Sequence, residues 1–203
     1  MNREEIIHSI ALTQIPGIGS VWAKNLISAA GSATEVFKSA KDLPGLTRRI
    51  VEALNCPQAF ERAEKEYEFI EKNKITCLPI KADNYPTRLL ECNDAPIVLY
   101  FKGEIDFNTE KIVSIVGTRN ISEYGKQISN QFIADLKKSC PDVLIISGLA
   151  YGVDICVHRA SVENNLSTVA VLAHGLDRIY PSAHRKTAVE MLRNGGLLTE
   201  YIT

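Results

Sequence analysis

The segment KIVSIVGTRNISEYGKQISNQFIADL, Lys111–Leu136, decides how the second half of the chain is interpreted. It opens with a run of β-branched apolar residues that stops at Gly117, a pattern typical of a buried strand. Ser122 then has the chemistry of a helix N-cap, and apolar residues return at Ile128 and Phe132 with helical spacing. The segment therefore predicts a strand, a glycine-containing turn and a helix.

The same alternation continues towards the end of the sequence. Short β-rich runs at 142–148, 167–173 and 196–201 are separated by helical patterns over 153–164 and 183–193. Apolar strands that alternate with helices are typical of parallel sheets. We therefore predict an α/β fold, a Rossmann-like parallel sheet with helices on both faces.

A different pattern occupies the first part of the chain. In TQIPGIGSVWAKNLISAAGS, residues 13–32, Pro16 and two glycines interrupt two helical patterns with the spacing of a helix-hairpin-helix. A weaker copy follows at Leu43–Leu54, with Thr47 in place of the second glycine. These two half-motifs predict a small all-helical (SAM-like) domain ahead of the sheet.

The predicted organisation has three parts. Residues 1–57 form the helical domain with helix-hairpin-helix-like turns, 58–110 form a connecting helix and lead-in strands, and 111–203 form the Rossmann-like core.

Composition and charge limit the possible functions. The 203 residues carry a net charge of −1, so binding to an anionic polymer would need a local basic patch. No apolar run reaches the roughly 18 residues of a membrane span, and the N-terminus lacks the pattern of a signal peptide. The five cysteines are scattered without a CxxC pair, which favours reduced thiols and no metal site. We therefore expect a cytoplasmic protein without a membrane segment.

Three predicted strand ends carry glycine-containing turns that lead towards helices. Their backbone N–H groups and the helix N-termini are suited to binding an anion at the carboxyl edge of the sheet. Arg119 adds a bidentate phosphate donor, although a single such turn is more often a plain joint between strand and helix. The candidate phosphate-binding residues in and after these turns are Gly117, Thr118, Arg119, Gly125, Ser147, Gly148, Gly152 and Tyr180.

Other motifs leave alternatives open. The Walker P-loop and the G-x-G-x-x-G dinucleotide fingerprint are both absent, so we predict no nucleotide cofactor. Asp154 and His158 lie four residues apart on one predicted helix, either as a general base pair or as a structural hydrogen bond. Arg185 and Lys186 begin the last predicted helix, either facing an anionic partner or simply solvated. Tyr180 either stacks on a base or packs.

Four ordered blocks then identify a family resemblance. They are SIVGTRNISEYG, IISGLAYGVDICVHRASVEN, TVAVLAHGLDRIYPSAHR and GGLLTEY, preceded by the lead-in YPTRLLECNDAPIVLYFKG. In order and spacing they resemble the core of the DNA-processing protein A family (DprA, also called Smf). The resemblance covers nearly the whole chain.

The resemblance implies a non-enzymatic role. Members of this family bind and protect single-stranded DNA, help load the RecA recombinase onto it in natural transformation and DNA uptake, and usually act as dimers. The resemblance assigns the phosphate site to the Gly117-Thr118-Arg119 turn. Tyr151 stands where the family often has a basic residue, and His184 where it often has asparagine. The DNA-binding pocket is therefore expected to depend on Arg178, Arg185 and Lys186.

The resemblance also raises questions about the end of the chain and about function. In the family the chain continues beyond the strand that ends here near Tyr201, so the core is expected to be incomplete at the C-terminus. An alternative function is a Rossmann-like small-nucleotide sensor or nucleotide hydrolase that uses Asp154 and His158. A third is a protein-interaction module whose DNA-binding surface lies outside this segment.

Overall fold

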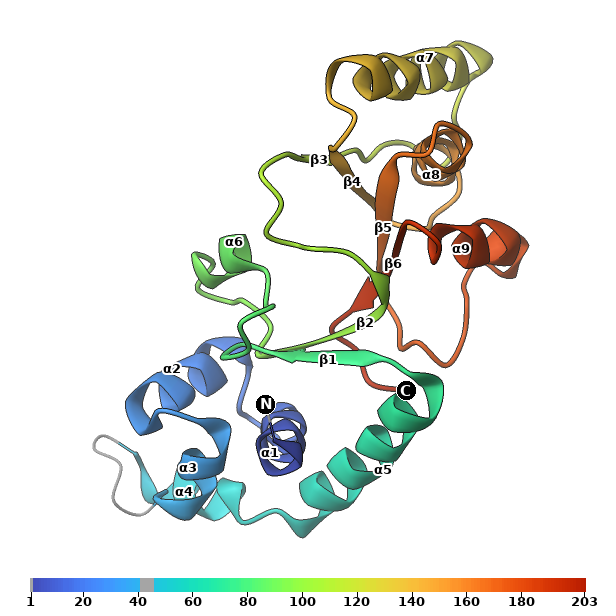
Figure 1. Ribbon diagram of the computed structural model, residues 1–203. Coiled ribbons are helices and arrows are strands. Elements are labelled where there is room, and N and C mark those ends of the chain that lie inside the picture. Colours follow the sequence, from blue (N-terminus) through green and yellow to red (C-terminus); the bar gives the residue numbers. More distant parts are fainter. Residues whose placement is uncertain (1, 41–45) are drawn as a thin grey trace. The chain divides into compact units, whose positions relative to one another are not determined.

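The computed structural model describes residues 2–40 and 46–203, which form two compact units, Met1–Leu99 and Tyr100–Thr203. The helices and strands are shown in Figure 1. The first unit contains α1 (Arg3–Thr13), α2 (Ser20–Ala30), α3 (Ala33–Lys38), α4 (Arg48–Leu54), α5 (Pro57–Asn73), β1 (Thr76–Pro79) and α6 (Thr87–Leu90). β2 (Val98–Glu104) crosses the boundary. The second unit continues with β3 (Ile112–Ser114), α7 (Glu123–Ser139), β4 (Leu144–Ser147), α8 (Val153–Glu163), β5 (Ser167–Leu172), the 3-10 turn η1 (Ser182–His184), α9 (Arg185–Met191) and β6 (Gly195–Thr199).

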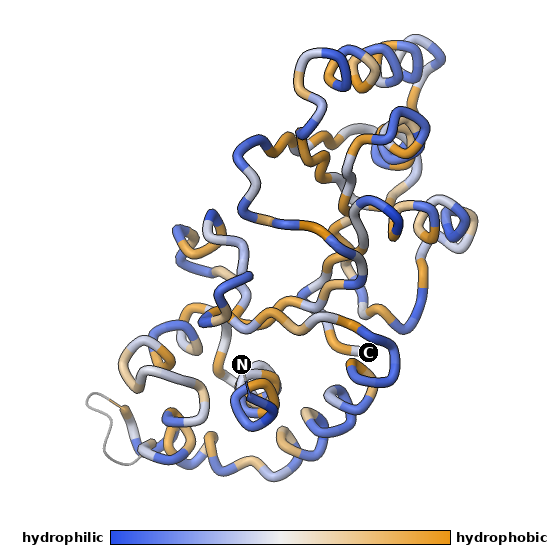
Figure 2. The backbone as a smooth tube through the Cα atoms, in the orientation of Figure 1, coloured by the Kyte–Doolittle hydropathy of each residue, from blue (hydrophilic) through white to orange (hydrophobic). Residues whose placement is uncertain are grey.

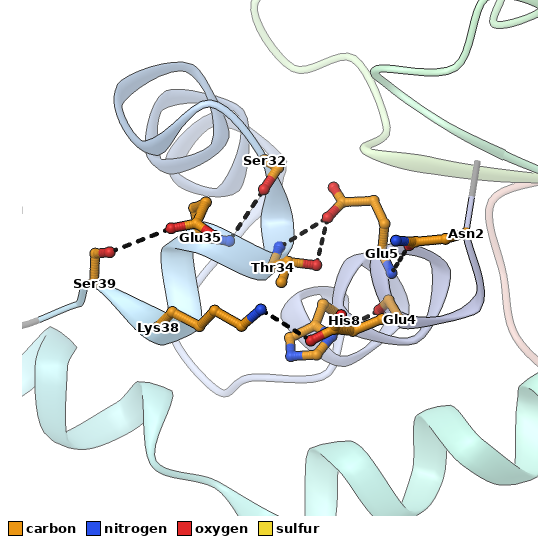
Figure 3. Close-up of polar contacts among 9 residues, drawn as sticks. All are labelled: Asn2, Glu4, Glu5, His8, Ser32, Thr34, Glu35, Lys38 and Ser39. Atoms are coloured by element: carbon orange, nitrogen blue, oxygen red, sulfur yellow. Dashed lines mark hydrogen bonds and ion pairs between the residues drawn. The ribbon is translucent and has the colours of Figure 1, made fainter.

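In the first unit, a carboxylate on α1 caps a neighbouring helix. Both oxygens of Glu5 accept hydrogen bonds at the start of α3, from the backbone N–H groups of Ala33 and Thr34 and from the Thr34 hydroxyl, at 2.6–2.9 Å. Figure 3 shows the two that come from Thr34. The negative charge of the carboxylate also interacts favourably with the positive end of the α3 dipole. This cap ties α1 to α3. His8 of α1 meets the rings of Phe37 and Phe60 edge-on.

The predicted hairpin of the first unit can be followed only in part. Between α1 and α2, Gly17 takes a positive φ of 85°, as a tight turn requires. In the second predicted half-motif, Thr47 is the N-cap of α4, whereas residues 43–45 lie outside the described residues. The three-part division at residues 57 and 110 stays a prediction, although α5 packs against α1 within the first unit.

The described strands form one mixed sheet in the order β1-β2-β6-β5-β4-β3. β3 to β6 are parallel, which confirms the predicted Rossmann-like α/β fold. β2 runs antiparallel to β6, a detail that the sequence did not reveal. Figure 2 shows apolar residues concentrated along these strands and alternating with polar residues along α7. Within the described part of the chain, no helix is both long and apolar enough to cross a bilayer.

The helices of the second unit gather on one face of the sheet. Ile133 of α7 packs in a cluster with Ile145 of β4, and Ala188 of α9 packs in a cluster with Ala170 of β5. The register pairs Ile145 with Thr168, two residues before Ala170, so both clusters lie on the same face. The order β3-β4-β5-β6 never reverses, and right-handed crossovers then place every connecting helix on the same side. The predicted coverage of both faces is therefore not seen for α7, α8 and α9.

Candidate functional site

A cavity of about 260 Å³ opens at the carboxyl ends of β4 and β5. We call it the strand-end cavity. β3, β4 and β5 are parallel, so the turns that follow them meet at one edge of the sheet. The lining residues are Arg119, Gly148, Leu149, Ala150, Tyr151, Val171, Leu172, Ala173, His174, Tyr180 and Pro181. Each of the three predicted turns contributes to this lining.

Gly152 allows the Gly117–Arg119 turn to pack directly against the Ser147–Gly152 turn. A side-chain carbon at this glycine would lie 2.0 Å from the carbonyl oxygen of Thr118 and 2.7 Å from the Cα of Arg119. The Val153 N–H donates a 3.1 Å hydrogen bond to the same Thr118 oxygen. With φ at 85°, the backbone also adopts a conformation that only glycine takes readily. The contact places Arg119 next to the Ser147–Gly152 turn.

Two buried histidines hold the Ser147–Gly152 turn from behind. His158 of α8 contacts the Gly148 carbonyl through Nε2, and His184 contacts the Leu149 carbonyl through Nδ1 at 2.7 Å. Because a carbonyl only accepts, these nitrogens are assigned as the protonated ones. The second nitrogen of His158 lies 2.7 Å from the hydroxyl of Thr168 on β5. The turn is therefore fixed to α8, to β5 and to the segment before α9.

The position of His158 bears on the predicted acid–base pair. Its side chain is fully buried and both ring nitrogens have partners other than Asp154. Burial lowers the pKa of His158 to about 4, and the hydrogen bond to Gly148 and the charge of Asp154 act in the opposite direction. A ring that is neutral and out of contact with solvent is poorly suited to act as a general base, and its hydrogen bonds go to Gly148 and Thr168 and not to Asp154.

The charge and the exposed rings at the strand-end cavity are suited to an anionic, aromatic ligand. Arg119 is exposed, and no described carboxylate lies within ion-pair distance of it. The Tyr180 and Tyr151 side chains are 71% and 51% exposed, and Tyr151 meets the ring of His184 edge-on at 4.8 Å. Sequence reasoning noted Tyr151 only as a departure from a family pattern. Its place inside a glycine turn was the available signal.

His174 is a lining residue that sequence reasoning missed. Its Nδ1 lies 2.8 Å from the Gly175 carbonyl, so Nδ1 carries the proton. Nε2 is then a hydrogen-bond acceptor, and it is buried without a protein partner in the described structure. No group of three or more metal-ligating side chains occurs within residues 2–40 and 46–203.

The remaining predicted site residues divide by location. The Ser147 hydroxyl donates to the Ile115 carbonyl at 2.6 Å, and the Gly125 N–H donates to the Ser122 side chain at 3.1 Å. Both groups are thus engaged within the fold, and Ser122 is confirmed as the N-cap of α7. Gly117 and Thr118 lie in the exposed turn before Arg119. Three predicted cations are exposed and do not line the strand-end cavity: Arg178, Arg185 and Lys186.

Comparison with known proteins gives consistent matches. The family model described as DNA recombination-mediator protein A matches residues 74–203. The DNA processing protein DprA of Streptococcus pneumoniae is 34% identical over 131 residues, 64% of this chain and 45% of that protein. Protein Smf of Synechocystis is 30% identical over 213 residues, 99% of this chain and 52% of that protein. The chain thus spans about half the length of these curated relatives.

Two solved structures are also similar. The X-ray structure of DprA from Streptococcus pneumoniae aligns with 99% of this chain and 68% of its own, with a TM-score of 0.64 and 25% identity. A structure of DNA processing protein A from Helicobacter pylori, described for its single-stranded DNA binding mode, aligns with 64% of this chain and 57% of its own, with a TM-score of 0.53 and 30% identity.

Proposed function

The chain belongs to the DNA recombination-mediator protein A family, and from this premise we propose that it binds single-stranded DNA at the strand-end cavity. One observation carries the proposal. An unpaired arginine, Arg119, shares a cavity with the exposed rings of Tyr151 and Tyr180. Single-stranded DNA offers both a phosphate for the guanidinium and bases that stack on aromatic rings.

The geometry also explains how a chain with a net charge of −1 binds a polyanion. The attraction is local, because the Gly152 contact brings Arg119 to the edge where the N-terminus of α8 begins. Stacking on aromatic rings does not depend on base identity, because every base has a π-face. Binding is therefore expected to tolerate any sequence and to weaken with salt.

Replacing Arg119 with alanine tests this site. A charge-assisted hydrogen bond contributes about 1.5–3 kcal/mol, so the affinity for a labelled oligonucleotide should fall on the order of 10- to 100-fold. Fluorescence anisotropy with an oligo-dT of about 20 nucleotides measures it, at several salt concentrations.

Arg193→Ala is the matched control. Arg193 is exposed and lies two residues before the start of β6, so it is at the amino edge of the parallel strands, opposite the strand-end cavity. Its removal takes away the same charge and should leave the affinity within about twofold. Arg119→Ala protein that binds as tightly as the wild type would exclude the strand-end cavity as the binding site.

We propose further that the bound strand is protected and handed to the RecA recombinase during DNA uptake, by a dimer of the whole cytoplasmic protein. Family membership supports this role. The expected result is faster RecA filament formation on an oligonucleotide in the presence of this protein. RecA-dependent ATP hydrolysis measures it, with Arg119→Ala as the comparison. Equal stimulation by the wild type and by Arg119→Ala would contradict a role for the strand-end cavity in loading.

A further inference from the structure

A second cavity, of about 330 Å³, lies between α7 and α8. We call it the α7–α8 cavity. Its lining residues come from the starts of the two helices and from their facing sides: Ile121, Lys126, Asn130, Gly152, Ile155, Cys156, Arg159 and Glu163. None of the sequence motifs assigned to DNA binding accounts for it, apart from Gly152.

Two cations from different helices face this cavity. Arg159 of α8 is exposed, and its Nε donates a long hydrogen bond of 3.4 Å to the Thr187 hydroxyl. No described carboxylate lies within ion-pair distance of its guanidinium. Lys126 of α7 pairs with Glu123 at 2.6 Å, but that pair is exposed and therefore weak. Both cations are available to an anion.

Between the two cations lies a neutral hydrogen-bonding pair. The Cys156 thiol donates to Oδ1 of Asn130 at 3.5 Å, which orients the amide and leaves its Nδ2 as a donor. Burial raises the pKa of Cys156, against the opposite effects of Lys126 and Arg159. The thiol is therefore protonated at neutral pH and does not compete with an incoming anion.

The two cavities adjoin the same backbone junction. Gly152 lines the α7–α8 cavity and packs directly on Thr118 and Arg119. Arg119 in turn lines the strand-end cavity. The contact between Gly152 and Arg119 therefore separates the two cavities. A polymer with one phosphate at Arg119 has the cationic α7–α8 cavity directly beside it.

We propose that the α7–α8 cavity is a second phosphate subsite, in which Lys126 and Arg159 hold a phosphodiester of the strand whose neighbouring nucleotides occupy the strand-end cavity. The inference rests on the proposed function and extends it, because two subsites define the path that the DNA strand follows across the surface. A polyanion longer than the strand-end cavity uses both subsites, whereas a very short one uses only the first.

The test compares two oligo-dT probes, of about 4 and about 20 nucleotides, on wild-type protein and on the double variant Lys126→Gln, Arg159→Gln. Loss of the one phosphate held in this subsite should reduce the slope of log affinity against log salt by about 0.7 for the long probe. The affinity for that probe at 0.1 M salt should fall on the order of tenfold. The short probe should bind both proteins equally.

Two further variants sharpen the experiment. Lys138→Gln, Arg193→Gln removes the same charge at the ends of α7 and α9, away from both cavities, and should leave the long probe unaffected. Glu163→Gln removes the carboxylate of the α7–α8 cavity and should tighten binding of the long probe. Thermal unfolding of each variant shows whether the fold is retained.

The outcomes separate the two proposals. Unchanged affinity of the folded double variant for the long probe, or equal weakening for both probes, overturns the second subsite and leaves the strand-end cavity in place. Inorganic phosphate is then added as a competitor of each probe. If it displaces the long probe from the wild type but not from the double variant, and never displaces the short probe, the α7–α8 cavity is a site for free phosphate instead. A wild-type protein that binds neither probe overturns the proposed function and the subsite together.

Discussion

Replacing Gly152 with alanine is expected to destabilise the second unit by about 3 kcal/mol and to abolish binding of the oligonucleotide. The added methyl group would lie 2.0 Å from the Thr118 carbonyl oxygen, a distance that no van der Waals contact permits. The φ of 85° adds backbone strain for any residue with a side chain. The neighbouring atoms are backbone, so the turn that carries Arg119 has to move. Denaturant unfolding followed by circular dichroism measures the first effect and anisotropy the second.

Gly17→Ala is the matched control for this prediction. Gly17 has the same φ of 85°, but a side-chain carbon there meets no atom within 4 Å. This variant therefore carries the backbone strain alone, about 1–2 kcal/mol, and should keep full oligonucleotide binding. Equal losses of stability in the two variants would show that the contact with Thr118 contributes nothing.

Acidification is expected to weaken the second unit through His158. In the unfolded chain the imidazole has its ordinary pKa of 6.5, whereas in the folded protein burial lowers that pKa to about 4. Between these two values the unfolded state binds the proton and the folded state does not. The contribution of the neutral ring to the free energy of unfolding is therefore complete above pH 6.5 and declines as the pH falls towards 4. The total loss is about 3 kcal/mol.

Two measurements check this effect. Denaturant unfolding at pH 7 and pH 4.5 should show a smaller difference in a His158→Gln variant than in the wild type, since that variant lacks the titrating ring. The NMR signals of the His158 ring in the native protein should show no protonation at pH 5.5. A ring that titrates near 6.5 would contradict the burial on which the structural role of His158 depends.

Much of the second unit could be predicted from local sequence. The N-cap at Ser122 and the spacing of Ile128 and Phe132 located α7, and apolar runs located β4 and β5. These signals are short-range, because capping and periodicity depend on neighbouring residues. The one-sided arrangement of α7, α8 and α9 depends instead on strand order, which pairs segments far apart in the chain and leaves no local trace.

The candidate site was predictable to a similar extent. Arg119, Gly148 and Tyr180 meet in one cavity because parallel strands end at one edge. The cations beyond Tyr180 were expected there as well, but Arg185 is the first residue of α9 and its side chain does not line the cavity. The roles of His158 and His184 depend on carbonyls 10 and 35 residues away. Spacing along a helix cannot reveal contacts of that range.

The two histidine contacts fix the backbone of the Ser147–Gly152 turn without involving the side chains that the turn exposes to solvent. In a trans peptide the N–H points opposite to the C=O, so holding the carbonyls of Gly148 and Leu149 also fixes the directions of the next two amides. This restraint comes from inside the fold, whereas Tyr151 is half exposed. The side chain at position 151 can therefore be replaced while the backbone of the turn keeps its conformation. Exchanging tyrosine for lysine there would convert a stacking surface into a second positive charge without rebuilding the loop.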